Sequence, residues 1–137
     1  MQVYRWADAG HEITYEQFKL PIETPAVPAP DFWRAPTDND IGTWHMEKEA
    51  ATWRNAGSNR KLTNIKTDIV SPHEAKVTSL FTIPASTPSN VRLVYSIYGS
   101  GDVLMDYSFT PGASSLPLIP EIGVLLTLPS EFENVTR

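Results

Sequence analysis

The sequence has no cysteine, few positive charges and no clustered basic residues. Without cysteine, the chain cannot form disulfides, thiolate nucleophiles or cysteine-ligated zinc sites. Eleven Lys and Arg residues stand against 16 Asp and Glu, for a formal net charge of −5. The longest basic run is Arg60–Lys61, so no positive surface is expected for a phosphate backbone. These features exclude nucleic acid as an expected partner.

Long apolar runs are also missing. No stretch approaches the roughly 18 apolar residues of a membrane-spanning helix. The N-terminal segment lacks the charged and apolar regions of a secretory signal. We therefore expect a soluble protein with no membrane partner and no signal peptide, and favour the cytoplasm over other compartments.

What is present suits one folded domain of short elements. The 137 residues are 41% hydrophobic and 20% charged, the composition of a globular protein. Twelve prolines interrupt the chain, and four of them lie in Pro21–Pro30. Prolines lack the backbone N–H donor and favour extended geometry, so this segment is predicted to be a linker.

Most of the remaining chain has the two-residue period of β-strands. His11–Leu20 has this period before the linker. Four later runs repeat it, with apolar side chains at Ile65 and Ile69; at Val77, Phe81 and Ile83; at Val91, Leu93, Tyr95 and Ile97; and at Val103, Met105, Tyr107 and Phe109. The glycines of Tyr98–Asp102 predict a tight hairpin turn between the last two runs. A Pro-, Ser- and Gly-containing loop, Pro111–Pro120, then precedes a final strand predicted within Glu121–Pro129.

One short helix is predicted near residues 44–57. Thr43 can cap its N-terminus, good helix formers follow, and Gly57 can end it in a left-handed conformation. The apolar positions form only part of a helical stripe, so the helix is expected to pack through Ala50 and Trp53. The fold class is thus mainly antiparallel β with one short helix.

Familiar catalytic and metal-binding motifs are absent. The three histidines are too far apart in sequence for a typical zinc site, and neither a nucleophile elbow nor a phosphate-binding glycine loop occurs. Asp38, Asp40 and Glu49 partly imitate a calcium loop. Gly42 and Thr43 occupy the positions where that loop needs an oxygen ligand and a glycine, so no metal site is expected.

The stretch DFWRAPTDNDIG, residues 31–42, combines aromatic, cationic and acidic side chains with proline. Arg34 offers a planar fork that can pair with Asp38 or Asp40, and acidic side chains in turns accept hydrogen bonds from local amides. One interpretation is a self-pinned loop that inserts Phe32 and Trp33 into a core. The other is a sugar-binding rim, in which an aromatic face lies beside fixed polar groups. The residues alone favour the structural interpretation.

The same stretch resembles the motif that opens the small-chain (fifth) domain of the β-galactosidases of glycoside hydrolase family two. ATWRNAG, YSIYGSGDVLMDYSF and LPLIPEIGVLLTLPSEFENVTR resemble later parts of that domain, so the likeness extends over residues 30–137. AGHEITYEQFKLP resembles the final strand of the preceding domain. The resemblance implies three parts: residues 1–20 from the preceding domain, a linker over 21–30, and a partial small-chain domain over 31–137.

The resemblance implies a galactose-mutarotase-like β-sandwich, internally shortened and C-terminally truncated. Family members are retaining glycosidases that hydrolyse terminal β-D-galactosides with two glutamates on a separate (β/α)₈ barrel. No residue of this chain matches either glutamate, so the chain alone is expected to be inactive. No cofactor is expected in this chain, because Mg or Na in the parent enzymes would be bound elsewhere.

In the family, the loop containing the Arg-Ala-Pro motif lies at the edge of the active-site pocket. Supporting roles at the substrate rim are therefore implied for Trp33, Arg34, Asp38, Asn39 and Asp40, and a catalytic role for none. Other β-galactosidase domains, a second copy of the chain and a β-galactoside are the expected partners. Two alternatives stay open: a free-standing carbohydrate-binding module, and a structural or oligomerisation domain that binds no sugar.

Overall fold

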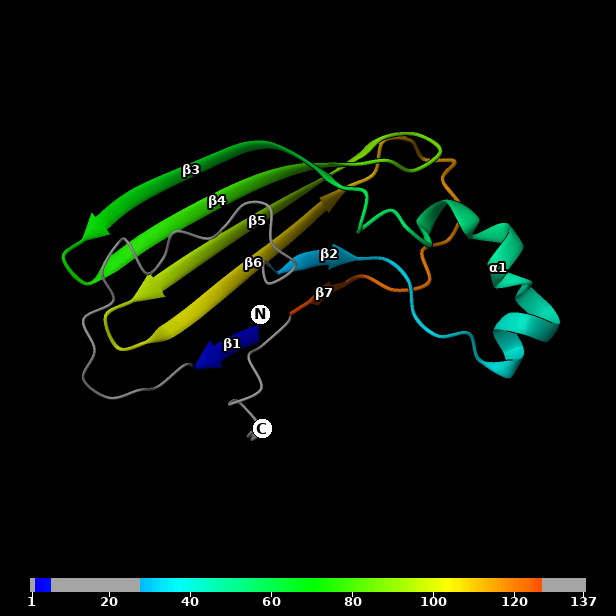
Figure 1. Ribbon diagram of the computed structural model, residues 1–137, viewed down its shortest axis with the longest axis horizontal. Coiled ribbons are helices and arrows are strands. Elements are labelled where there is room, and N and C mark those ends of the chain that lie inside the picture. The colour runs from blue at the N-terminus through cyan, green and yellow to red at the C-terminus, as the bar shows by residue number, and fades with distance from the viewer. Residues whose placement is uncertain (1, 6–27, 127–137) are drawn as a thin grey trace.

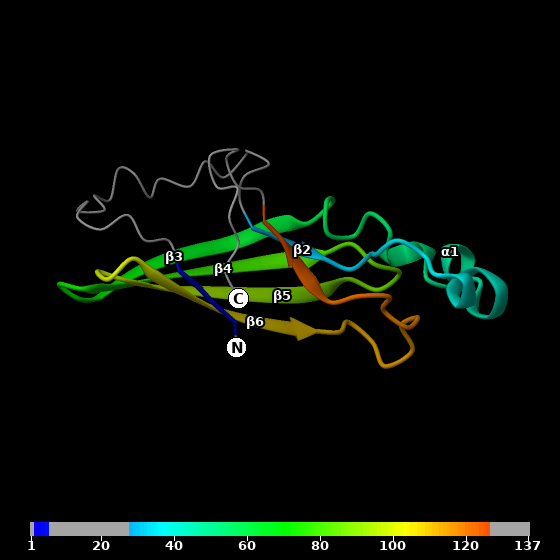
Figure 2. The same ribbon diagram turned by 90° about the horizontal axis from the view of Figure 1, so that it is seen from below.

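A computed structural model of the protein describes residues 2–5 and 28–126 (Figure 1). They form a five-stranded antiparallel sheet and a two-stranded ribbon, which confirms the mainly β prediction. Across the sheet the strands are β1 (Gln2–Arg5), β6 (Asp102–Thr110), β5 (Ser89–Tyr98), β4 (Glu74–Ile83) and β3 (Lys61–Ser71). The ribbon consists of β2 (Ala29–Asp31) and β7 (Gly123–Leu125). Figure 2 shows the ribbon on one side of the sheet and the helical segment, residues 40–53, beyond one end.

The predicted strand period accounts for the buried face of the large sheet. Val91 lies between Phe81 of β4 and Phe109 of β6, and the three side chains share one face. Along β4, burial alternates from Val77 to Ile83. Apolar side chains directly opposite each other stabilise neighbouring strands, so this face forms the centre of the core.

Three aromatic rings join separate parts of the chain. The ring of Phe32 lies 5.4 Å from those of Trp53 and Phe109, and the rings of Trp53 and Phe109 are 6.0 Å apart. Phe32 and Trp53 are completely buried. The Trp53 indole N–H donates to the carbonyl oxygen of Pro117 at 3.1 Å. The cluster therefore fastens the segment after β2, the helical segment and the loop before β7 to β6.

The single predicted helix is wrong in detail, because the segment is divided into three short pieces. A π-helical turn, Asp40–Trp44, is followed by α1, Met46–Glu49, and by a 3₁₀ turn, Ala51–Trp53. His45, with φ of 54°, stands where a continuous helix would need right-handed backbone. It occupies the N-cap position of α1, so the predicted Thr43 cap is also wrong.

The predicted packing of this segment is confirmed, since Ala50 and Trp53 are both completely buried. The role predicted for Gly57 is wrong, because Gly101 is the only glycine of the described residues with positive φ. At Gly57 an added Cβ would lie 2.1 Å from the carbonyl oxygen of Pro30. Glycine is needed there so that the turn after the helical segment can approach β2.

The predicted hairpin is confirmed between β5 and β6. Gly101 has φ of 85°, and its N–H donates to the carbonyl oxygen of Tyr98 at 2.9 Å. Positive φ is accessible to glycine without a steric penalty, which explains its place in this turn.

The N-terminal segments contain two strands whose pairing partners were not predicted from the sequence. Strand β1 lies in the segment attributed to a preceding domain, yet it pairs with β6 in the main sheet. Ala29 and Pro30, the last residues of the predicted linker, belong to β2 and pair with β7. Three predicted features lie outside the described residues. They are the strand His11–Leu20, linker residues 21–27, and the part of the predicted final strand that follows residue 126. Within the described ranges, no helix is long and apolar enough to cross a membrane.

Gly57→Ala should destabilise the protein by about 1–3 kcal/mol, because the new methyl group would overlap the Pro30 backbone. Urea unfolding followed by circular dichroism would measure the change. Gly42→Ala is the matched control, since an added Cβ at Gly42 meets nothing within 4 Å. Equal loss of stability in both variants would contradict the close-approach explanation.

The buried hydroxyl of Tyr95 makes the free energy of unfolding depend on pH in the alkaline range. Burial raises the pKa of its hydroxyl to about 12, against an ordinary value of 10.0, and the hydroxyl has no hydrogen-bond partner among the described residues. The unfolded chain releases this proton at lower pH than the folded protein does. The contribution of Tyr95 to folding stability is therefore fully present below about pH 10 and is lost as pH rises toward 12.

Tyr95→Phe should reduce the loss of stability between about pH 10 and 12, because phenylalanine has no proton to release. Thermal melting at pH 8 to 11.5 would test this. Tyr98→Phe, which removes a tyrosine hydroxyl from the end of the same strand, is the matched control. A wild-type profile for Tyr95→Phe would contradict the prediction.

Candidate functional site

The loop at residues 31–42 starts with a local turn that separates its two aromatic side chains. The Asp31 carboxylate accepts hydrogen bonds from the N–H groups of Phe32, at 2.8 Å, and Trp33, at 3.3 Å. Phe32 enters the core, whereas Trp33 stays half-buried at its margin. The guanidinium of Arg54 lies 5.8 Å from the centre of a Trp33 ring. Trp33 thus keeps part of its surface exposed while held in place.

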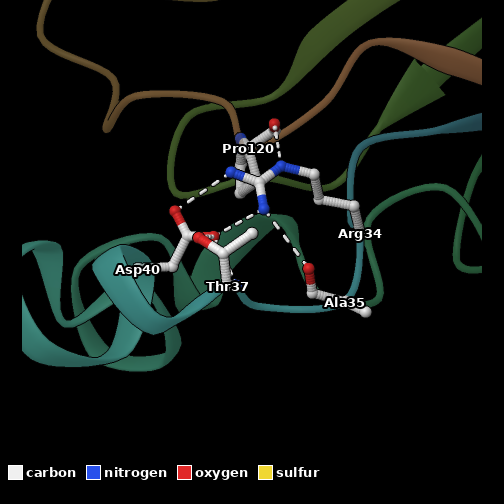
Figure 3. Close-up of polar contacts among 5 residues, drawn as sticks. All are labelled: Arg34, Ala35, Thr37, Asp40 and Pro120. Atoms are coloured by element: carbon white, nitrogen blue, oxygen red, sulfur yellow. Dashed lines mark hydrogen bonds and ion pairs between the residues drawn. The ribbon is translucent and has the colours of Figure 1, made fainter.

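Arg34 and Asp40 form a two-point ion pair across the loop (Figure 3). Arg34 Nη1 donates to Asp40 Oδ2 at 2.5 Å, and Nη2 donates to Oδ1 at 3.0 Å. The Asp40 side chain is 8% exposed and that of Arg34 is 34% exposed. This geometry resolves the two pairings allowed by the sequence, because Arg34 selects Asp40 rather than Asp38.

Thr37 completes the binding of the Asp40 carboxylate. Its backbone N–H and its hydroxyl both donate to Asp40 Oδ2, each at 2.7 Å. Hydrogen bonds from Arg34 and Thr37 stabilise the ionised carboxylate and hold the Asp40 pKa well below its usual range. The hydrogen bond to Asp40 likewise raises the Arg34 pKa. The pair is therefore ionised at neutral pH.

Arg34 also fastens this loop to the segment that precedes β7. Its Nε donates to the carbonyl oxygen of Pro120 at 3.2 Å, and Nη1 donates to that of Ala35, also at 3.2 Å (Figure 3). Pro120 lies 86 residues further along the chain. One guanidinium thus fixes the shape of the loop and its position against a distant segment.

The five rim candidates fall into two groups. Arg34 and Asp40 engage each other, and Trp33 lies at the core margin. Asp38 and Asn39 are exposed, so their side chains are open to solvent on the outside of the pinned loop. The loop combines a rigid base with exposed polar groups.

Sequence reasoning missed Thr37 and Pro120. Thr37 precedes Asp40 by three residues, the spacing of a capping box, in which an acidic side chain accepts a hydrogen bond from the N–H of the Ser or Thr three residues earlier, so this partner could have been found. Pro120 binds Arg34 through its backbone carbonyl oxygen, and no pattern of side chains in a sequence predicts such a contact.

The acidic residues of this loop are poorly suited to holding a metal. Both Asp40 oxygens accept hydrogen bonds from Arg34 or Thr37. Over residues 2–5 and 28–126, no group of three or more His, Asp or Glu side chains is arranged to hold a metal ion. The similarity of Asp38 and Asp40 to a calcium loop does not extend to the geometry.

Asp40→Asn should lower the melting temperature at pH 7, because it removes the ionic partner of Arg34. Since the folded Asp40 pKa is depressed, its contribution is present above about pH 4 and is lost as pH falls toward the folded pKa. The difference from wild type should therefore shrink between pH 5 and pH 2 in thermal melts. Asp38→Asn, at an exposed position two residues away, is the control. A difference that is independent of pH would contradict the ion-pair explanation.

Comparison with known proteins gives the family of the chain. Residues 2–136 match the family described as "Beta galactosidase small chain". A β-galactosidase from Priestia megaterium is 26% identical over 182 aligned positions that include 96% of this chain. Because the chain has only 137 residues, that relative has residues in the aligned span with no counterpart here, as in an internally shortened piece.

Two further relatives, both named β-galactosidase, support the match. The one from Lactobacillus delbrueckii subsp. bulgaricus is 34% identical over 75% of this chain, and the one from Clostridium acetobutylicum is 30% identical over 75%. The matched regions cover 17%, 10% and 11% of the three relatives, so the chain corresponds to a small part of each. The chain belongs to the β-galactosidase small-chain family.

Proposed function

We propose that this chain is a non-catalytic part of a β-galactosidase of glycoside hydrolase family two. It supplies a β-sandwich scaffold and a loop at the rim of an active site on another part of the enzyme. The observation that carries this proposal is the two-point pairing of Arg34 with Asp40, which fixes the loop and leaves Asp38 and Asn39 exposed.

The exposed groups have the chemistry needed to meet a sugar. A carboxylate accepts hydrogen bonds from hydroxyl groups, and an amide both donates and accepts them. The half-buried Trp33 supplies an aromatic surface of the kind that packs against the apolar face of a sugar. A loop that is already rigid loses little conformational entropy on binding, so Asp38 and Asn39 are the best candidates for contacts with a β-galactoside.

The chemical step is assigned to other domains. Retaining hydrolysis of a glycoside needs an acid/base carboxylate and a nucleophilic carboxylate about 5–5.5 Å apart. The family resemblance implies that both stand on a separate barrel, and this is supported by the small share, 10–17%, of the matched relatives that this chain spans. Mg or Na would likewise be bound outside this chain.

In a β-galactosidase that contains this chain as its small-chain part, Asp38→Ala or Asn39→Ala should lower kcat/KM about tenfold. Loss of a hydrogen bond to the bound sugar accounts for a change of this size. Most of the change should fall on KM, since these residues bind substrate and do not perform chemistry. Steady-state hydrolysis of a nitrophenyl β-galactoside would measure it.

Asp106→Ala is the matched control, because it removes an exposed aspartate from β6 and should leave both constants unchanged. Wild-type kinetics in both loop variants would overturn the rim assignment. The isolated chain should release no nitrophenol, and release by pure protein would overturn its non-catalytic role. A saturable tryptophan-fluorescence response of the isolated chain to galactose, lost in Trp33→Ala, would favour the carbohydrate-binding module instead.

A further inference from the structure

Strand β3 is a long edge strand that exposes large apolar side chains. Among the described residues it pairs only with β4, so its other edge has no partner strand (Figure 1). Ile65, Ile69 and Val70 are 41%, 73% and 50% exposed. An exposed apolar edge strand is a template for another β-strand.

The regular part of β3 lies between two irregularities. Register shifts occur between Leu62 and Asn64 and between Ile69 and Ser71, whereas residues 64–69 pair one-to-one with β4. Bulges twist an edge and discourage pairing beyond them. The usable edge is therefore short and centred near Thr67.

The backbone restricts how two copies of β3 can pair around a twofold axis. Along an edge strand, alternate residues direct their N–H and C=O groups outward, and residues opposite each other in an antiparallel pair have the same hydrogen-bonding state. At the twofold axis, one residue must therefore lie directly opposite its own copy. An axis midway between two neighbouring residues is excluded. The central candidates are Lys66, Thr67 and Asp68.

Side-chain chemistry selects one of these registers. An axis at Lys66 places Lys66 opposite its own copy, and an axis at Asp68 places Asp68 opposite its own copy. Both registers are unfavourable, because like charges directly opposite each other are destabilising. An axis at Thr67 places Lys66 opposite Asp68 of the second copy, twice. It also places Ile65 opposite Ile69, twice, so both charged and apolar positions are complementary.

We infer that β3 mediates self-association, with two copies of the chain pairing antiparallel about Thr67 to form one continuous sheet. Ile65 and Ile69 lie opposite Ser79 and Ala75 of β4, on the face that carries the core residue Val77. Pairing would cover their exposed surface and extend the apolar face across the dimer. On the other face Lys66 and Asp68, now 2.7 Å apart within one chain, would join a four-charge network.

The absence of cysteine permits a direct test of register in the full chain. In the inferred dimer the two copies of residue 67 have Cα atoms about 4.5–5.5 Å apart, within the range of a disulfide. Thr67→Cys should therefore give a covalent dimer on oxidation with copper–phenanthroline. Ile65→Cys is the control, because its two copies would be about 13 Å apart along the strands and should not cross-link.

A mixture of Ile65→Cys and Ile69→Cys chains should cross-link to each other, since these positions are opposite. Gel electrophoresis without reductant would separate the products, and circular dichroism would establish that each variant is folded. The inference is overturned if Thr67→Cys gives no covalent dimer. Equal cross-linking of Thr67→Cys and Ile65→Cys would also overturn it.

Charge variants give an independent test by analytical ultracentrifugation at about 100 µM chain, a concentration at which a dimer with a Kd of about 1 µM is largely formed. Lys66→Asp or Asp68→Lys alone should weaken self-association about tenfold, because each places like charges opposite at two points. A one-to-one mixture of these variants should restore dimers, since every opposed pair is then complementary. Lys61→Asp, in the same strand but outside the regular edge, should dimerise like wild type. A monomeric wild-type chain, or failure of the mixture to associate, would overturn the inference.

Discussion

The guanidinium of Arg34 is the interaction on which the candidate site depends. It binds both oxygens of Asp40 and also the carbonyl of Pro120, so it defines the loop and attaches it to the segment before β7. A lysine could not reproduce this arrangement, because a single ammonium group cannot form the planar two-point contact with a carboxylate. Arg34 and Asp40, the charged pair of the motif, therefore bind each other.

The hydrophobic core makes this polar arrangement possible. Phe32 and Trp53 pack with Phe109, and the Trp53 indole holds Pro117, three residues before the Arg34 partner Pro120. Aromatic packing thus holds the residues next to both ends of the Arg34 contact. Two explanations that the sequence left as alternatives, a pinned loop and a pocket rim, are compatible, because pinning is what would keep rim residues in place.

Local sequence pattern predicted the parts of the fold that are determined locally. The four long strands were predicted from alternation, and the hairpin from its glycines, because neighbouring residues determine both. Burial of Ala50 and Trp53 also followed from their spacing. At the candidate site, composition indicated that Arg34 would pair with an acid of the loop, but both Asp38 and Asp40 were within reach.

The features that sequence did not predict depend on distant segments. Gly57 matched a helix-ending residue, yet its actual constraint is the backbone of Pro30. Ala29 and Pro30 resembled a linker because their strand is defined only by pairing with β7, more than 90 residues away. The helical segment contains good helix formers but is interrupted at His45, where left-handed backbone overrides local propensity.

The order of the strands keeps the loop and the self-complementary edge apart. Phe32, the loop residue in the aromatic cluster, contacts Phe109 of β6, whereas β3 is separated from β6 by β5 and β4. Three strand spacings of about 4.8 Å place β6 roughly 14 Å from β3. A second copy paired at β3 would therefore lie on the far side of β4 and β5 from the strand that Phe32 contacts. Assembly through the edge and contact with a sugar at the loop are therefore compatible in one molecule, because two strands separate the β3 edge from the strand that the loop contacts.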